Sequence, residues 1–299
     1  MSFVEEVFET QFAPHLSLGD WSGRTETFRT ALSLLEAEKR EKTSIVETGT
    51  CRQPIEADFW TNGASTLIFD KYLEYHDGSC YSIDIDSQLQ AQVRSQLSEK
   101  STLICEDSIL GLRELTASLE RIDLLYLDSM DLCWIAPETS AVHHLKELAV
   151  SLALLRSGSL VLIDDSPRSE EWLPPWAANW SQPIWEIIPP EARLKWLSET
   201  VAGEALSRIS SQQTTPDIVA LREVLDRSTA ALSSGDLSTS AELTEQLKET
   251  FLRCIPGTTT HPDYKPNARC PGKGLYACEL LETLGEKIAH DYQVLYRIT

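Results

Sequence analysis

The chain has 299 residues, which is enough for one large α/β domain with an elaboration or for two small domains. Its 46 acidic and 26 basic side chains give a formal net charge of −20, and a field of that sign repels phosphate backbones and anionic lipid surfaces. We therefore expect neither nucleic acid nor a membrane as a partner. A positively charged small molecule suits this field, although solubility alone accounts for much of the charge.

The cysteines and the first residues indicate a cytoplasmic protein. Seven cysteines, at positions 51, 80, 105, 133, 254, 270 and 278, form no CxxC pair and no zinc-ligand spacing, so we expect reduced thiols. The start, MSFVEEVFETQF, has neither a basic region nor a long apolar run, and no stretch reaches the roughly 18 apolar residues that a membrane span requires. We expect no export signal and no membrane anchor.

Between residues 44 and 165, short β-rich runs alternate with helical ones, a pattern typical of a parallel sheet with helices on both faces. The predicted helices between the strands begin near Ser65, Ser87 and Ser140, and the five predicted strands are 44–48, 80–85, 102–105, 122–128 and 159–164. Ahead of them, in segment 1–43, Phe28, Ala31, Leu32 and Leu35 have helical spacing, which predicts an amphipathic helix on the substrate side.

The alternation stops after Asp165. Residues 166–190 contain six prolines and four tryptophans, Trp172, Trp176, Trp180 and Trp185, which favours an irregular packed loop that either covers the site or anchors the segment. A helix near 191–209 and a helical hairpin follow, the hairpin with Thr215-Pro216 at its start, a turn at 234–236, and a capping box from Thr239 to Glu242.

From residue 272 the α/β pattern resumes with one helix and two closing strands. We therefore predict a doubly wound, Rossmann-like α/β domain formed by 44–165 and 272–299, with a seven-stranded, mostly parallel sheet that ends in an antiparallel hairpin. Residues 166–271 are predicted to be a helical insertion, either a lid or an element that joins a homodimer.

Acidic residues follow successive predicted strands, at the edge where open α/β sheets bind ligands. In the segment from Ile45 to Thr50, Glu47 stands two residues before Gly49, where an acid can bind the amino group of an amino-acid-like cofactor. This pattern is neither the three-glycine dinucleotide fingerprint nor a P-loop, which argues against nicotinamide and ATP.

The next two strands end on further acids. Asp84 or Asp86 can accept hydrogen bonds from ribose hydroxyls, and we favour Asp84 because it lies nearer the strand. Asp107 and Ser108, which follow Glu106, are placed to meet an adenine ring edge. Each acid alone is by default a solvated loop residue, but acids at three consecutive strand ends favour one nucleoside cofactor with an amino-acid tail.

Six strings carry a family resemblance: VETGTCR, STLIFDKYLEY, YSIDID, DLLYLDS, HHLKEL and LVLIDD. They resemble the class I S-adenosylmethionine (SAM) dependent O-methyltransferases, in particular the group that holds the catechol and macrocin-type sugar enzymes. The resemblance implies SAM contacts at Glu47, Thr48, Gly49, Thr50, Ser65, Thr66, Asp84, Asp86, Asp107, Ser108 and Asp128, with Ser65 and Thr66 near the methionine carboxylate. One departure is the string RQPIEADFWTNGA between the glycine loop and the helix that begins at Ser65.

The same group includes metal-dependent members, and three acids of this chain suit a metal. Asp128 ends the fourth predicted strand, and Asp164 and Asp165 end the fifth, so three carboxylates should converge. Mg²⁺ and similar hard cations prefer such oxygen ligands and would chelate two substrate oxygens and lower a hydroxyl pKa. The alternative is that Asp164 and Asp165 cap the loop while Asp128 serves only the cofactor.

The general base has several candidates. Asp131 stands where catechol-type enzymes carry a lysine, and His143 and His144 follow the loop LCWIAPETSAV. Either histidine could accept a hydroxyl proton near neutral pH, or simply begin a helix. Lys273, between two glycines, is a weaker candidate, because such a lysine usually lies in a flexible turn.

The sequence thus predicts SAM-dependent methyl transfer to a hydroxyl oxygen of a small molecule, assisted by Mg²⁺ or another divalent cation. Two alternatives remain. One is a metal-independent N-methyltransferase, although no (N/D)PPY string follows the fourth strand. The other is a non-catalytic scaffold that retains the fold and docks partners through its helical hairpin.

Overall fold

The computed structural model describes residues 2–16, 23–50, 64–132, 138–166, 189–207, 209, 215–235, 238–254 and 272–299. The chain divides into two compact units. The first contains Met1–Leu132, Ser140–Arg168 and Gly272–Thr299, and the second contains Cys133–Thr139 and Ser169–Pro271. Each unit is described by itself.

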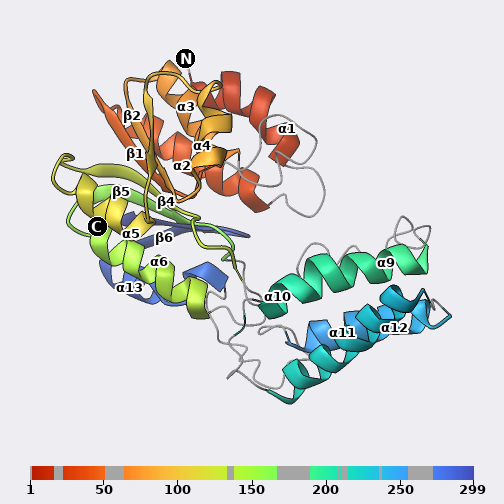
Figure 1. Cartoon of the computed structure of the whole chain (residues 1–299). Helices are drawn as coiled ribbons and strands as arrows, with labels where there is room; N and C mark the ends of the chain where they lie inside the picture. Colours follow the sequence, from red (N-terminus) through yellow and green to blue (C-terminus); the bar gives the residue numbers. More distant parts are fainter. Residues whose placement is uncertain are drawn as a thin grey trace. The chain divides into compact units, whose positions relative to one another are not determined.

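The first unit is built on a seven-stranded sheet with the order β3-β2-β1-β4-β5-β7-β6 (Figure 1). Strands β1 to β5 are parallel, and β7 runs antiparallel to both β5 and β6. The strands are β1 (Thr43–Thr48), β2 (Gly78–Asp84), β3 (Ser101–Cys105), β4 (Ile122–Leu127), β5 (Leu155–Ile163), β6 (Gly285–His290) and β7 (Val294–Ile298). The predicted Rossmann-like α/β fold with a seven-stranded, mostly parallel sheet and a C-terminal antiparallel hairpin is confirmed.

The strand order reverses between β1 and β4, and this switch point determines where a ligand can bind. β1 leads outward to β2 on one side, whereas β4 leads to β5 on the other. In open α/β sheets, ligands bind at the carboxyl ends of the strands beside such a switch point. β4 is buried along its whole length, as expected for a central parallel strand covered on both faces.

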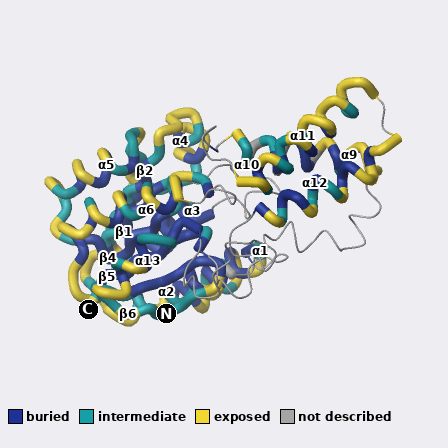
Figure 2. The backbone as a smooth tube through the Cα atoms, turned by 90° about the horizontal axis from the view of Figure 1, so that it is seen from below, coloured by how far each residue is buried: buried dark blue, intermediate teal, exposed yellow. Residues whose placement is uncertain are grey.

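Helices cover both faces of the sheet (Figure 1). On one face lie α2 (Gly23–Glu38), α3 (Ser65–Tyr75) and α4 (Ser87–Arg94), with the N-terminal η1 (Val4–Phe12) and α1 (Ala13–Leu16); on the other lie α5 (Ser108–Leu115), α6 (Glu138–Ser151) and α13 (Ala277–Leu284). The predicted apolar face of α2 is buried, with Phe28 packed 5.6 Å from the Tyr126 ring of β4 and 6.0 Å from the Phe69 ring of α3. The buried strands between these layers are dark blue in Figure 2.

Helix ends differ slightly from the prediction. Asp86, and not Ser87, caps α4, because its carboxylate accepts hydrogen bonds from the amides of Gln88 and Leu89. α6 begins at Glu138, two residues before Ser140. Helices η1 and α1 lie in segment 1–43, which was predicted to be helical, whereas helix α5 was not predicted.

The second unit is helical and contains α9 (Pro190–Trp196), η4 (Leu197–Ala202), α10 (Gly203–Ser207), α11 (Pro216–Ser234) and α12 (Ser240–Cys254). The predicted hairpin start is confirmed, since the Thr215 hydroxyl accepts a hydrogen bond from the Ile218 amide at 3.3 Å. α11 and α12 share a core that includes Leu221, Leu247 and Phe251. The homodimer through this insertion and the cytoplasmic location stay predictions.

Within the described residues, no helix combines the length and apolarity needed to traverse a bilayer. The four tryptophans of 166–190 and most of RQPIEADFWTNGA lie outside the described residues, so their predicted roles are not developed further.

Candidate active site

The loop after β1 lies directly against the end of β4. The Gly49 amide donates to the carbonyl of Ile83 at 2.8 Å, and the Asp128 amide donates to the Thr48 carbonyl at 3.0 Å. Gly49 has a φ of +86°, and a Cβ there would lie 2.5 Å from the Asp128 carbonyl oxygen. Only glycine therefore allows the two strand ends to approach this closely at the switch point.

Glu47 is completely buried at the end of β1. Its carboxylate accepts hydrogen bonds from the hydroxyl of Ser65 and, at 2.8 Å, from that of Thr66, both in the first turn of α3. Burial raises the pKa of Glu47 to about 7, although the hydroxyl donors oppose the shift. Glu47, Ser65 and Thr66 thus lie together. Because Glu47 is buried behind the two hydroxyls, it would affect a ligand by holding the first turn of α3 in position.

Asp84 fixes the glycine loop from the neighbouring strand. One carboxylate oxygen accepts from the Thr50 amide and the other from the Asp86 amide, each at 2.8 Å. The Thr50 hydroxyl also lies 2.9 Å from that of Ser82. Asp84 is half-buried, and so its oxygens can accept further hydrogen bonds from a ligand. Asp86 is exposed and caps α4.

A surface-exposed apolar residue beside Asp84 escaped the sequence reasoning. Ile85 is 77% exposed, the largest exposed fraction among the large hydrophobic residues described. The exposed Cys105 thiol lies 3.8 Å from its carbonyl. The sequence did contain a signal, because Ile85 stands between the two acids Asp84 and Asp86. An apolar side chain at such a position is exposed to water unless a ligand covers it.

Asp107 and Ser108 begin α5 and meet α6. The Asp107 carboxylate caps α5 by accepting from the amides of Ile109 and Leu110 at 3.1 and 3.2 Å. The Ser108 hydroxyl lies 2.9 Å from Nε2 of His143, and the same nitrogen lies 3.4 Å from Glu147. The hydrogen bond to Glu147 raises the pKa of His143 above its usual value.

Glu147 is buried and lies close to Ser129, His143 and His144. It was not among the site residues predicted from the sequence. It accepts from the Ser129 hydroxyl at 2.6 Å and lies 3.8 Å from Nε2 of His144. Burial alone would raise its pKa, but His144, His143 and the hydroxyl donors lower the pKa of Glu147 to about 2. Ser129 directly follows Asp128, so this group adjoins the end of β4.

His144 has the environment of a core histidine. Its side chain is fully buried, and its Nδ1 lies 2.7 Å from the carbonyl of Ser140, one turn earlier in α6. Burial lowers the pKa of His144 to about 4. Of the two predicted histidines, His143 is therefore the one with access to solvent.

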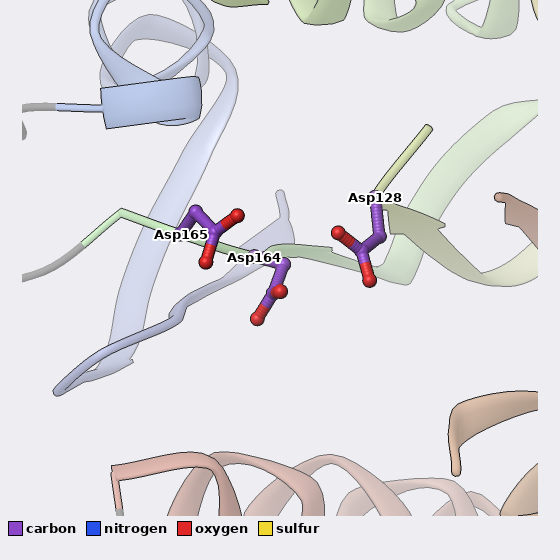
Figure 3. Close-up of side chains that lie close together, drawn as sticks. All are labelled: Asp128, Asp164 and Asp165. Carbon is purple, nitrogen blue, oxygen red and sulfur yellow. The ribbon is translucent and has the colours of Figure 1, made fainter. Parts of the chain in front are cut away.

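Three carboxylates converge where β4 and β5 end. Asp128, Asp164 and Asp165 each offer an oxygen within 4.8 Å of the others. In Figure 3 the carboxylates of Asp128 and Asp165 face each other, with Asp164 between them. Burial, followed by the charge of Asp164, raises the pKa of Asp128 to about 8.

Two buried cations lie within this carboxylate cluster. Arg24 of α2 donates from Nε and Nη2 to the two oxygens of Asp164, at 2.8 and 2.6 Å, and its charge outweighs burial and holds the pKa of Asp164 well below its usual value. The ammonium group of Lys273 donates to Asp128 and lies 3.1 Å from Asp165. Lys273 is 1% exposed, so it does not lie in the flexible turn that its flanking glycines suggested.

The carboxylate cluster has the right donor atoms for a divalent cation but not the right surroundings. A cation among the three carboxylates would lie close to both Arg24 and Lys273. Two unit charges about 4 Å apart interact by about 4 kcal/mol at a protein-like dielectric, and a divalent ion doubles each repulsion. The residues present therefore do not fit a metal in this arrangement, and no chemical step is derived through one.

Asp131, the remaining candidate base, is half-buried in the loop after β4. Its role as a base stays a prediction.

No protein-family model matches this sequence. No curated protein matches it either.

Among solved structures, DesVI from Streptomyces venezuelae is 14% identical with a TM-score of 0.33, over 56% of this chain and 61% of that chain. A SAM-dependent methyltransferase from Geobacter sulfurreducens, in complex with S-adenosyl-L-homocysteine, is 11% identical with a TM-score of 0.31, over 90% of each chain. A cyclopropane synthase from Mycobacterium tuberculosis is 10% identical with a TM-score of 0.33, over 80% of this chain and 82% of that chain.

Proposed function

We propose that this protein is a SAM-dependent methyltransferase that acts on a hydroxyl oxygen of a small molecule. The observation that carries the proposal is the junction at the switch point, where Gly49 brings the β1 loop against Asp128 and Asp84 fixes the same loop from β2. A nucleoside with an amino-acid tail has the length and polarity to lie across these strand ends.

Each part of such a ligand has a matching surface. Ribose hydroxyls can donate to Asp84, whose oxygens retain acceptor capacity, and a base ring can cover Ile85 and remove its apolar surface from water. The first turn of α3, held by Glu47, presents backbone amides and the positive end of the helix dipole to a carboxylate. The net charge of −20 attracts a sulfonium cation.

SAM, when bound, supplies an electrophilic methyl group to an acceptor oxygen. The contribution of the chain is to orient the reactants and exclude water at the end of β4, which raises the effective concentration of the acceptor. His143 is our candidate for the group that takes the hydroxyl proton. Its Nε2 is held by Ser108 and Glu147, and Nδ1 has no hydrogen-bond partner within the parts of the chain that the structure describes.

The acceptor class rests on the resemblance of the strand-end motifs to O-methyltransferases. The proposal does not include the divalent cation implied by the same resemblance, because Arg24 and Lys273 already form ion pairs with the carboxylate cluster. The two alternatives, an N-methyltransferase and a non-catalytic scaffold, differ from the proposal in the product formed and in SAM affinity, respectively.

Cofactor binding can be tested by calorimetric titration with S-adenosylhomocysteine. We expect Ile85→Ser to weaken binding about 5- to 20-fold, since roughly 1–2 kcal/mol of apolar burial is lost. Leu152→Ser is the matched control, because Leu152 is an exposed apolar residue after α6, away from the strand ends. The ligand should also slow alkylation of Cys105, measured by peptide mass spectrometry.

The results discriminate among the candidate functions. Equal affinities for the wild type, Ile85→Ser and Leu152→Ser would contradict the proposed cofactor position. No binding at all, by a folded wild type, would favour the scaffold. With binding established, transfer of a labelled methyl group from SAM to a panel of phenols, sugars and amines distinguishes oxygen from nitrogen acceptors.

A further inference from the structure

The carboxylate cluster formed by Asp128, Asp164 and Asp165 is already closed by the chain itself. We infer that Lys273, together with Arg24, takes the place of the divalent cation that these acids suggest, and that the centre is metal-independent. This inference concerns the ion requirement of the site, so it stands or falls separately from the identity of the methyl acceptor.

Every carboxylate oxygen of the cluster already has a donor. Asp164 accepts from Arg24 on both oxygens and from the Gln293 amide at 2.8 Å. Asp165 accepts from the Tyr292 hydroxyl at 2.6 Å on one oxygen and lies 3.1 Å from the Lys273 ammonium on the other.

The oxygens of Asp128 are also engaged. One accepts from Lys273 and the other from the Tyr126 hydroxyl at 3.3 Å. A metal would have to displace these donors, and each displaced group would lose its partner inside the protein.

The charges balance in the same way as with a metal. With all three carboxylates ionised, one divalent ion gives a sum of −1, and one arginine with one lysine gives the same sum of −1. The Lys273 ammonium bridges Asp128 and Asp165, which come from different strands, and this is the bridging position that a shared cation would occupy.

The backbone holds Lys273 in this position. Gly272 has a φ of +79°, and a Cβ there would lie 2.0 Å from the Asp165 carbonyl oxygen. The Lys273 amide donates to that same carbonyl at 3.0 Å. Gly272 therefore permits a close backbone approach that places the Lys273 ammonium between Asp128, which follows β4, and Asp165, which lies beyond the end of β5, and we regard Lys273 as a positioning residue for the strand-end carboxylates.

Manganese provides a direct test, because free Mn²⁺ has a strong electron paramagnetic resonance signal that falls on binding. The full chain is first treated with EDTA, then exchanged into metal-free buffer and titrated with Mn²⁺ up to about 1 mM, with and without S-adenosylhomocysteine. We expect the wild type to leave the signal of free Mn²⁺ unchanged. A wild type that binds Mn²⁺ with a 1:1 stoichiometry would overturn the inference.

A lysine variant gives the complementary result. In Lys273→Ala the cluster has one cation fewer and a space next to Asp128 and Asp165, so we expect Mn²⁺ affinity to rise at least about tenfold over the wild type. Lys287→Ala is the matched control, since Lys287 pairs with Glu282 at 3.2 Å near the surface. A folded Lys273→Ala protein that binds no more Mn²⁺ than the control would contradict the role given to Lys273.

The wild-type titration keeps the inference testable if Lys273→Ala does not fold. Failure of the inference is also distinguishable from failure of the proposed function. Mn²⁺ binding by a wild type that also binds S-adenosylhomocysteine refutes only the metal independence, whereas absence of nucleoside binding refutes the proposed function and leaves the manganese result valid.

Discussion

Replacing Glu47 by Gln should stabilise the free protein and weaken its binding of SAM. Glu47 is completely buried, and its carboxylate accepts hydrogen bonds from the hydroxyls of Ser65 and Thr66. Glutamine keeps the shape. Its amide oxygen can accept from one of these hydroxyls and its amide nitrogen can donate to the other, while the substitution removes a charge that the fold must otherwise hold away from water. The side chain would thus be retained for binding at a cost in stability.

The magnitude follows from the pKa. Burial raises the pKa of Glu47 from 4.5 to about 7, and each unit corresponds to about 1.36 kcal/mol. Because the folded pKa is the higher one, the unfolded chain loses its proton first as the pH rises, and the stability of the fold falls between roughly pH 4.5 and pH 7. We expect Glu47→Gln to exceed the wild type by about 3 kcal/mol at pH 8 and by about 1 kcal/mol at pH 5.

Urea unfolding at several pH values measures this difference. Because the chain has two units, a signal specific to the first unit is needed, and pulse alkylation of Cys80, which is fully buried in β2, reports on the sheet. Glu74→Gln is a matched control on α3, where the side chain is 43% exposed. A stability difference between Glu47→Gln and the wild type that stays constant from pH 5 to pH 8 would refute the reasoning.

Three further predictions concern the strand ends. Gly49→Ala should destabilise the first unit by about 2–4 kcal/mol and abolish S-adenosylhomocysteine binding in calorimetry, because the added Cβ would clash with the Asp128 backbone after β4. Gly235→Ala is the control: Gly235 also has a positive φ, +71°, but open space around it, so the substitution should cost only about 1–2 kcal/mol. Asp164→Asn should lower the free energy of unfolding in urea by about 3–5 kcal/mol at pH 7, since the buried Arg24 then loses the negative charge of Asp164. The pairing lowers the pKa of Asp164, so the difference in stability between the wild type and the variant should shrink as the pH falls below about 4. His143→Gln should lower the rate of methyl transfer about 10²-fold or more and remove the rise of the wild-type rate with pH above about 6.5, and an unchanged pH–rate profile would exclude His143 as the base.

The sequence by itself determined the sheet and the places of its acids. Alternating β-rich and helical runs predicted the parallel order, and the rule that ligands bind at the carboxyl ends of strands placed Asp128, Asp164 and Asp165 together. These features are local, because the period of the apolar pattern and the residue after each strand can be read without knowing any distant contact.

Only the tertiary structure decided what each acid contacts. Arg24 reaches Asp164 from 140 positions earlier in the chain, and Lys273 reaches Asp128 from 145 positions later. No pattern of spacing links such distant residues. A lysine between glycines has the same local sequence whether its side chain is exposed to solvent or is buried among carboxylates at the ends of two strands.

The same limit applies to the histidines and to Glu47. His143 and His144 are neighbours in sequence, yet the helical turn of about 100° per residue directs one toward Ser108 and buries the other completely. The hydrogen bond to Glu147 raises the pKa of His143, whereas burial lowers the pKa of His144. Residue type and strand position follow from the sequence, whereas desolvation and charge pairing, which control the chemistry, depend on which distant segments the fold brings into contact.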